Sequence, residues 1–513
     1  MIDRHFFLDQ HGCAKNQVDG EILIGYLRDM GWTRTEVPED ASLIIVNSCG
    51  FIETAKTESL DAVMTARAAY PGAKVLLAGC LAERYAEDFR DSLPEADAFF
   101  GNGDLSRVGE VVRALFPETA DGKKAKNSAA TPDSAAAEGA ARPVLVPAQK
   151  GVCGGDRPEL LSFPRSAYVK ITEGCDNRCT FCAIPIIRGG LRSRSIEEIV
   201  TECRELVSRG TWELNLIGQD LAAFGCGDGE GHPVPDSNAA APADGNAVAP
   251  SPLSALLSAI SKIPGDFRVR LLYIHPDHFP RDILPVMTAD ARFLPYFDIP
   301  FQSGDSGILA KMNRRGSAET YQTLVSDIRR AFAEAKSPYG SVALRTTILT
   351  GFPGETDESF ETTARFLAAI RSMWSGAFTW SCEEGTPASE MKKRVPKKTA
   401  QKRLDTLKEI QIRITPEELA RFVGKPVEVL VEEIIADPVD VPDAAVGADE
   451  AEIPASRLAL GRAWFQAPEV DGSVVLQFED GQKDKAGKQI GAGSVVNAVI
   501  MAVNGVDVEA VAR

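Results

Sequence analysis

The sequence has few of the residues on which several classes of protein depend. Its 513 residues include only five histidines, which leaves little material for a histidine-rich metal site. Ten cysteines are too sparse for a disulfide scaffold in a chain of this length, so their clustering indicates metal binding or catalysis in a reducing compartment. The 56 basic residues are outnumbered by 73 acidic ones, and the resulting charge of -17 opposes broad attraction to nucleic acid phosphates.

Long apolar runs are missing as well. The chain nowhere contains about 18 consecutive apolar residues, and the opening MIDRHFFLDQHG has no basic region followed by an apolar run. We therefore expect neither secretion nor a membrane span, and we expect a cytoplasmic protein. The apolar content of 44% is typical of a globular chain, and the length suggests about three domains.

The first part of the chain, residues 1–117, alternates strand and helix patterns. The strands FFLDQHGC, LIIVNSC and KVLLAGC are separated by helical stretches, which predicts a parallel sheet flanked by helices. Residues 118–158 are rich in Ala, Ser, Pro and charge and lack an apolar period, so they predict a flexible linker.

A second alternating block covers residues 159–392. Its six apolar runs are AYVKIT, ELNLIGQ, RVRLLYIHP, YFDIPFQ, ALRTTILTGFPGE and AFTWS. Six strands with intervening helices predict an incomplete β/α barrel, whose chemistry lies at the carboxyl ends of the strands. Residues 226–252 are low in complexity and are interpreted as a surface insert. Residues 393–513 begin with a basic helix and continue as short Val-rich runs, which predict a small all-β module with an acidic insert at 436–455.

The strongest chemical signal is the loop GCDNRCTFC directly after the strand AYVKIT. Its cysteines, Cys175, Cys179 and Cys182, can converge on one metal centre at the carboxyl end of that strand. Three thiolates leave one iron of a four-iron cluster open to substrate, whereas an electron carrier usually supplies four cysteines. The alternatives are three space-filling thiols, or a zinc site without a visible fourth ligand.

Three other cysteines, Cys13, Cys49 and Cys80, each follow a predicted strand of the first domain. In a parallel sheet they emerge at one edge, where open α/β sheets place their ligands. This coincidence predicts a second three-thiolate cluster, with independent core or loop cysteines as the alternative. No chemistry is assigned to the remaining cysteines, Cys153, Cys203, Cys226 and Cys382.

The spacing of the barrel cysteines resembles the radical S-adenosylmethionine superfamily. The resemblance implies that the open iron binds S-adenosylmethionine and that one electron cleaves it to methionine and a 5′-deoxyadenosyl radical. By the same resemblance Phe181 packs on the adenine, although plain core packing would also explain it.

Two further strand ends are candidates for lining the cofactor. The segment GFPGE resembles the cofactor-lining loop of that superfamily and includes Gly351, Gly354 and Glu355, although a Pro-Gly turn is the alternative. Gln219 and Asp220 follow ELNLIG at the same edge of the barrel and are candidates for the cavity wall.

A three-cysteine domain, a radical barrel and a TRAM-like β-module in this order resemble the methylthiotransferases. This resemblance implies two 4Fe-4S clusters and S-adenosylmethionine as cofactors, together with a reducing electron donor and a sulfur source. It also implies insertion of sulfur into an unactivated C–H bond and methyl transfer from a second S-adenosylmethionine. By the same resemblance, the barrel cluster is expected to generate the radical and the N-terminal cluster to carry or donate the sulfur.

Two branches of that family compete for this chain. HGCAKNQVDGE around Cys13 and the terminal GRAWFQAPEVDG resemble the branch that modifies an aspartate of the twelfth small-subunit ribosomal protein, the RimO enzymes. Ser303, in DIPFQSGD, resembles the branch that modifies a tRNA adenosine, which is the alternative function. A two-cluster electron-transfer protein is a remote alternative. Over residues 416–513 acids outnumber bases more than twofold, which suits a basic protein partner, although a solvated acidic surface would look the same.

Overall fold

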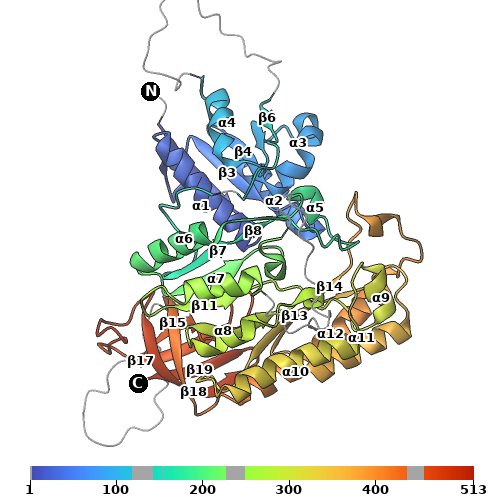
Figure 1. Cartoon of the computed structure of the whole chain (residues 1–513). Helices are drawn as coiled ribbons and strands as arrows, with labels where there is room; N and C mark the ends of the chain where they lie inside the picture. Colours follow the sequence, from blue (N-terminus) through green and yellow to red (C-terminus); the bar gives the residue numbers. More distant parts are fainter. Residues whose placement is uncertain (1–2, 118–141, 153, 227–248, 436–455) are drawn as a thin grey trace, which may run out of the picture.

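Three main sheets organise the computed structural model, which describes residues 3–117, 142–152, 154–226, 249–435 and 456–513. In Figure 1 the N-terminal part, in blue, lies above the central green and yellow sheet, and the C-terminal strands, in red, lie below it. The predicted combination of a parallel α/β sheet, an incomplete barrel and a small all-β module is confirmed. Most of the expected linker and of the two inserts, at 118–141, 227–248 and 436–455, lies outside the described residues.

The N-terminal sheet is parallel, with the strand order β2-β1-β3-β4-β5-β6. Its strands are β1 (His5–Gln10), β2 (Thr33–Arg34), β3 (Leu43–Ser48), β4 (Lys74–Gly79), β5 (Ala98–Phe100) and β6 (Val144–Leu145), and its helices are α1 (Ala14–Asp29), α2 (Glu53–Ala69), α3 (Cys80–Ser92) and α4 (Val108–Leu115). Every residue of β3 is buried, as expected for an apolar strand covered on both faces. β6 falls in the segment that the sequence assigns to the linker, and it pairs with β5.

The central sheet contains six parallel strands in the order β14-β13-β12-β11-β10-β7 and does not close. These strands are β7 (Ser166–Lys170), β10 (Glu213–Ile217), β11 (Arg268–Leu271), β12 (Phe293–Asp298), β13 (Ala343–Thr350) and β14 (Trp374–Thr379), with the short pair β8 (Thr172–Glu173) and β9 (Arg192–Ser193) beside them. Each of the six apolar runs noted in the sequence forms one of the six strands. Their carboxyl ends therefore share one edge, where barrel chemistry is expected.

The helices of this part of the chain are α5 (Ile184–Ile187), α6 (Ile196–Ser208), α7 (Pro252–Ile260), α8 (Ile283–Ala289), α9 (Ser306–Lys311), α10 (Ala318–Glu334) and α11 (Asp357–Ile370). Most of them cover the outer face of the central sheet, whereas α5 packs against α3 of the N-terminal part (Figure 1). Capping boxes fix the starts of α6, α10 and α11, because Ser195, Ser317 and Thr356 each accept a hydrogen bond from the backbone N–H three residues later. No helix in the described ranges combines the length and apolar character that a membrane span requires.

The long helix α12 (Lys397–Ala420) leads into a closed five-stranded barrel. The strands of this C-terminal barrel are β15 (Pro426–Ile435), β16 (Ser456–Arg462), β17 (Val474–Glu479), β18 (Val495–Asn504) and β19 (Asp507–Ala512). It packs under the amino ends of the central strands, where the Trp374 indole N–H donates to the Phe465 carbonyl across 2.6 Å.

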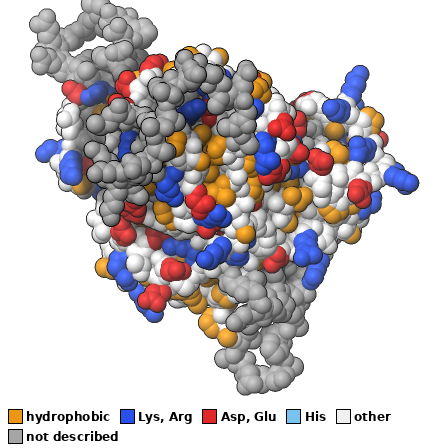
Figure 2. Space-filling view, turned by 90° about the horizontal axis from the view of Figure 1, so that it is seen from above, with side chains coloured by type: hydrophobic (Ala, Val, Ile, Leu, Met, Phe, Trp, Pro, Cys, Tyr) orange, Lys and Arg blue, Asp and Glu red, His pale blue; other side chains and the backbone are white. Residues whose placement is uncertain are grey.

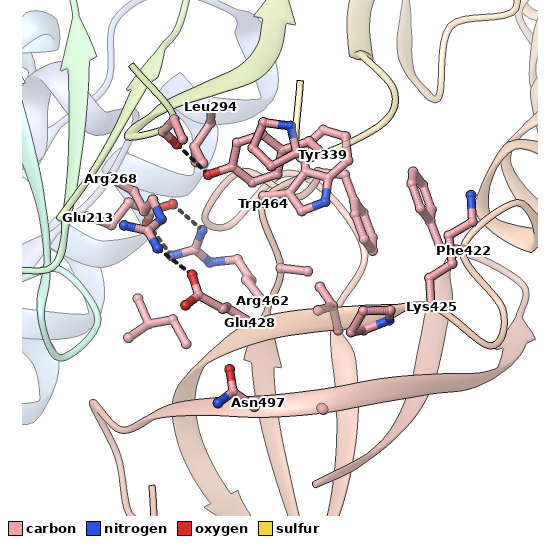
Figure 3. Close-up of a pocket in the computed structure, with 18 of the residues that line it drawn as sticks. Glu213, Arg268, Leu294, Tyr339, Phe422, Lys425, Glu428, Arg462, Trp464 and Asn497 are labelled. Atoms are coloured by element: carbon pink, nitrogen blue, oxygen red, sulfur yellow. Dashed lines mark hydrogen bonds and ion pairs between the residues drawn. The ribbon is translucent and has the colours of Figure 1, made fainter. Parts of the chain in front are cut away.

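A pocket of about 700 Å³ separates the C-terminal barrel from the central sheet (Figure 3). Beside it the carboxylate of Glu213 accepts hydrogen bonds from Arg270 at 2.8 Å and from Arg462 at 2.6 Å. Glu213 begins β10, so this pocket lies at the end of the strands opposite to the cysteines. The pocket is lined by residues of the central sheet and of the C-terminal barrel, and none of the six candidate cysteines is among them.

Candidate active site

The barrel cysteines occupy a short loop that backbone hydrogen bonds hold in place. The N–H of Cys175 donates to the Gly189 carbonyl across 3.1 Å, and that of Cys182 donates to the Cys179 carbonyl across 3.0 Å. Burial, together with the neighbouring Cys179, raises the pKa of the Cys182 thiol to about 12. Burial likewise raises the pKa of Cys175, with contributions from Asp220, Cys182 and Cys179. The three thiols are therefore close enough to repel one another as thiolates.

The N-terminal cysteines meet at the carboxyl ends of three adjacent strands. Cys13 caps the start of α1 after β1, Cys49 follows β3, and Cys80 begins α3 after β4. Gly12 allows the close approach, since a Cβ there would lie 3.1 Å from the Cβ of Cys49, and its φ of +91° also favours glycine. Burial, opposed by Arg188 and assisted by nearby Cys13 and Cys49, raises the pKa of Cys80 to about 12. The structure thus brings together cysteines that are 31 and more residues apart.

The N-terminal cysteines contact the segment that follows the barrel cysteines. Cys80 packs with Ala183 and Ile187, which directly follow the barrel cysteine loop. The guanidinium of Arg188 donates from Nη2 to Sγ of Cys80 across 3.3 Å, and Asn102 donates to the same sulfur across 3.3 Å. Both sites therefore lie at the carboxyl edge of the central sheet, where the N-terminal domain packs on it.

A closed ring of four buried charges holds this interface together. Asp19 of α1 pairs with Lys170 at 2.5 Å and with Arg188 at 2.9 Å, and Glu173 pairs with the same two cations at 2.6 Å each. All four side chains are at most 5% exposed. Burial alone raises the pKa of Glu173, but Lys170 and Arg188 outweigh it and lower the pKa to about 2. Each carboxylate is thus shared between two cations.

A second buried polar group supports the barrel cysteine loop. Asn177 donates to Sγ of Cys175 at 3.4 Å and to Asp220 at 2.8 Å. Asp220 is also 2.5 Å from Nε2 of His278, whose ring stacks on that of His275. Burial alone raises the pKa of Asp220, but His278 outweighs it and holds the pKa well below its ordinary range. Asp220 therefore carries a buried negative charge, and Asn177 links it to the candidate cluster ligand Cys175.

Of the other candidates for lining the cofactor, Phe181 lies among apolar side chains and Gln219 has an unpartnered polar atom. Phe181 makes an edge contact with Phe352 at 6.5 Å between ring centres, within a small apolar cluster. The buried Oε1 atom of Gln219 has no hydrogen-bond partner among the described residues, so it can accept one from a ligand.

The GFPGE loop is partly explained by packing. A Cβ on Gly351 would lie 2.5 Å from the Cβ of Ala400 in α12, and Gly351 and Gly354 both have positive φ angles. Glu355 accepts from the Gly351 N–H at 2.6 Å and pairs with Arg403 at 2.7 Å. The glutamate is thus used by the loop and by α12.

Ser303 and the cysteines without assigned chemistry lie outside these sites. Ser303 is buried, and its hydroxyl bonds that of Thr363 at 2.9 Å and accepts from the Asp305 N–H at 3.1 Å. Cys203 lies in the core of the central domain, Cys226 is buried, Cys382 is exposed, and Cys153 lies outside the described residues.

The donor set of each cysteine trio fits an iron-sulfur cluster. In the described part of the chain no three His, Cys, Asp or Glu side chains surround one position as the ligands of a single ion would. The thiolates of a cubane each bind a different iron, so they do not converge in that way. Hydrogen-bond donors to the sulfurs are present at both sites, from Asn177 and the Ile184 N–H at one and from Asn102 and Arg188 at the other.

Comparisons with known proteins match three successive parts of the chain. Residues 5–101 match the uncharacterized protein family UPF0004, residues 169–367 match the radical SAM superfamily, and residues 423–512 match the TRAM domain. The chain is 53% identical over 508 residues to the ribosomal protein uS12 methylthiotransferase RimO of Treponema denticola, covering 98% of this chain and 100% of that protein. It is 37% identical to the protein of that name from Desulfosudis oleivorans, over 90% of this chain and 91% of the relative.

Proposed function

Because the chain belongs to the RimO family of methylthiotransferases, we propose that it adds a methylthio group to the β-carbon of an aspartate in ribosomal protein uS12. The observation that carries this proposal is the contact between the N-terminal cysteines and the segment that follows the barrel cysteines, with Arg188 3.3 Å from Cys80. Replacing a C–H hydrogen by sulfur needs a hydrogen-abstracting centre and a sulfur-bearing centre within reach of the same carbon. The arrangement supplies two such positions at one edge of the central sheet.

The cysteines divide between two 4Fe-4S clusters in this proposal. Cys175, Cys179 and Cys182 hold the cluster of the barrel, and Cys13, Cys49 and Cys80 hold that of the N-terminal sheet. Together with S-adenosylmethionine, the clusters supply the radical that removes hydrogen and the sulfur that replaces it. The protein contributes buried donors that stabilise the thiolates, and a cation at the interface, Arg188, that offsets their charge.

S-adenosylmethionine is proposed to lie at the carboxyl edge of the barrel beside Cys179. Gln219 supports this position through its buried, unpartnered Oε1 atom. Phe181 supports it through the apolar surface that it presents beside the cysteine loop. The proposed lining also includes the GFPGE residues Gly351, Gly354 and Glu355, whose engaged carboxylate favours a backbone contribution from this loop.

The partners of the reaction are proposed on the same basis. They are uS12, free or within the ribosomal subunit, a reducing electron donor and a sulfur source, and the location is the cytoplasm. On the face shown in Figure 2, basic and acidic side chains are interspersed around hydrophobic ones, so no field of a single sign dominates there. Several acids of the C-terminal module fall in 436–455, outside the described residues, so charge steering by this module stays a prediction.

We also propose four successive parts of the chain, at 1–117, 118–158, 159–392 and 393–513. Three separate sheets support this division, while β6 indicates that the second part contributes to the first sheet. The tRNA adenosine alternative is not favoured by the relatives, and Ser303 is engaged in local hydrogen bonds.

The proposed acceptor is tested by offering two substrates at once. Reconstituted, reduced protein is incubated anaerobically with S-adenosylmethionine, sulfide, a uS12 peptide and unmodified tRNA, and both are then analysed by mass spectrometry. We expect a methylthio adduct on the aspartate of the peptide and none on the tRNA. An adduct on tRNA adenosine alone would overturn the acceptor, and 5′-deoxyadenosine without any adduct would overturn the methylthio transfer.

A further inference from the structure

Lys15 is a buried cation without an acidic partner. Its side chain is 7% exposed, and among the described residues no carboxylate lies within ion-pair distance of its ammonium group. Its Nζ atom instead lies 3.2 Å from the centre of the Tyr273 ring, in a cation–π contact. A buried charge is normally paired, so this arrangement leaves the ammonium able to bind an anion.

The two carboxylates that act electrostatically on Lys15 are already paired with other cations. These acids are Asp298 and Glu173. Asp298 lies 3.3 Å from Arg345, and Glu173 is shared between Lys170 and Arg188 at 2.6 Å each. Both acids are therefore engaged by other cations, and among the described residues neither forms an ion pair with Lys15.

The position of Lys15 relates it to the chemistry. It is the second residue of α1, two residues after Cys13, and the two side chains interact electrostatically. Tyr273 lies two residues beyond β11, at the carboxyl edge of the central sheet, and its φ of +69° is unusual for a non-glycine residue. The ammonium thus lies between the N-terminal cysteines and the catalytic edge of the barrel.

We propose that Lys15 binds the carboxylate of the substrate aspartate and so determines specificity for an acidic side chain. The inference rests on the proposed function. The β-carbon that receives sulfur is bonded to the carboxylate carbon, so a cation that fixes this carboxylate beside Cys13 also fixes the reacting carbon. An adenosine base has no carboxylate and would leave the ammonium buried and unpaired. Lys15 therefore favours a protein acceptor over a nucleoside.

The test compares two peptides on full-length protein that carries both clusters. One is a uS12 peptide with the acceptor aspartate, and the other has asparagine at that position; their dissociation constants are measured anaerobically by fluorescence anisotropy. For the wild type we expect about 10- to 100-fold preference for the aspartate peptide, the range of one charge-assisted hydrogen bond. Lys15→Met should reduce the preference to near one, and Lys15→Arg should retain most of it. Lys408→Met, which changes an exposed lysine on α12, is the matched control and should retain it fully.

A purely electrostatic role toward the cluster predicts a different result. If Lys15 only offset the negative charge of the N-terminal thiolates, Lys15→Met would shift the reduction potential of that cluster and leave the aspartate preference intact. That outcome would overturn the inference, as would an unchanged preference without any shift. Failure of the proposed function and failure of the Lys15 inference give different results. A missing methylthio adduct in mass spectrometry of the wild-type reaction counts against the proposed function, whereas the ratio of the two dissociation constants reports on Lys15.

Discussion

Arg188 donates from Nη2 to Sγ of Cys80 across 3.3 Å, from the central domain to the N-terminal one. Arg188 ends the short helix that follows the barrel cysteines, and Cys80 begins α3. Burial disfavours the Arg188 cation, but Cys80, Asp19 and Glu173 outweigh it and keep its pKa well above the ordinary value. A permanent positive charge from the central domain therefore lies beside the proposed N-terminal cluster.

The first prediction concerns the potential of the N-terminal cluster. Hydrogen bonds and positive charge near cluster sulfurs favour the reduced state, so Arg188→Met should make its reduction potential more negative. Arg188→Lys should shift it less, since the charge is kept. Potentiometric titration followed by electron paramagnetic resonance measures both variants, with the exposed Arg330→Met as a control. Equal potentials in all four proteins would show that Arg188 does not tune this cluster.

Acid should weaken the interface between the domains through Glu173. Its pKa is lowered to about 2 in the folded protein from an ordinary 4.5. The stabilisation is therefore complete above pH 4.5 and is lost as the pH falls from 4.5 toward 2. The free energy of unfolding of the cluster-free protein, measured by circular dichroism, should fall steeply in this pH range. In Glu173→Gln that pH dependence should be flatter, and an unchanged slope would refute the assignment.

Docking of the C-terminal barrel should depend on Arg462. It is 3% exposed and pairs with Glu213 and Glu432, so Arg462→Met leaves buried carboxylates short of a cation and should cost about 3–5 kcal/mol. Arg457 lies on the same strand, is 36% exposed and pairs with Asp480, so Arg457→Met should cost at most about 1 kcal/mol. Thermal unfolding and limited proteolysis compare the two. A similar loss in both variants would contradict the role given to the buried pair.

The barrel cluster should respond to Asp220. A negative charge near a cluster disfavours its reduction, so Asp220→Asn should make the potential of the barrel cluster less negative while keeping an acceptor for the backbone N–H of Ala222. The potential of the N-terminal cluster is the internal control and should stay constant. A shift of both potentials together would indicate a general change of structure instead.

The strands and the cysteine sets could be predicted from the sequence because both signals are local. Apolar runs such as ELNLI and RVRL mark the central strands, and a cysteine directly after a strand acquires its position from the parallel topology. β6 could not be predicted, since two residues are too few to show a period.

The charged residues of the interface could not be predicted for a different reason. Lys170 and Asp19 are 151 residues apart and meet only when two domains pack. Lys15 has the same kind of origin, because its contact with Tyr273 depends on docking of α1 against the central sheet. A lysine near a cysteine in the sequence is expected to be exposed to solvent. Only the structure shows that Lys15 is buried and has no acidic partner among the described residues.

The central claim, that two clusters divide the chemistry, is tested most directly by replacing Cys13, Cys49 and Cys80 together with alanine. Iron content, 5′-deoxyadenosine and the methylthio peptide are then measured on the same anaerobic preparation. The account predicts a fall from about eight to about four irons per chain, continued formation of 5′-deoxyadenosine and no methylthio peptide. Unchanged iron content, or a methylthio adduct made by the triple variant, would contradict it.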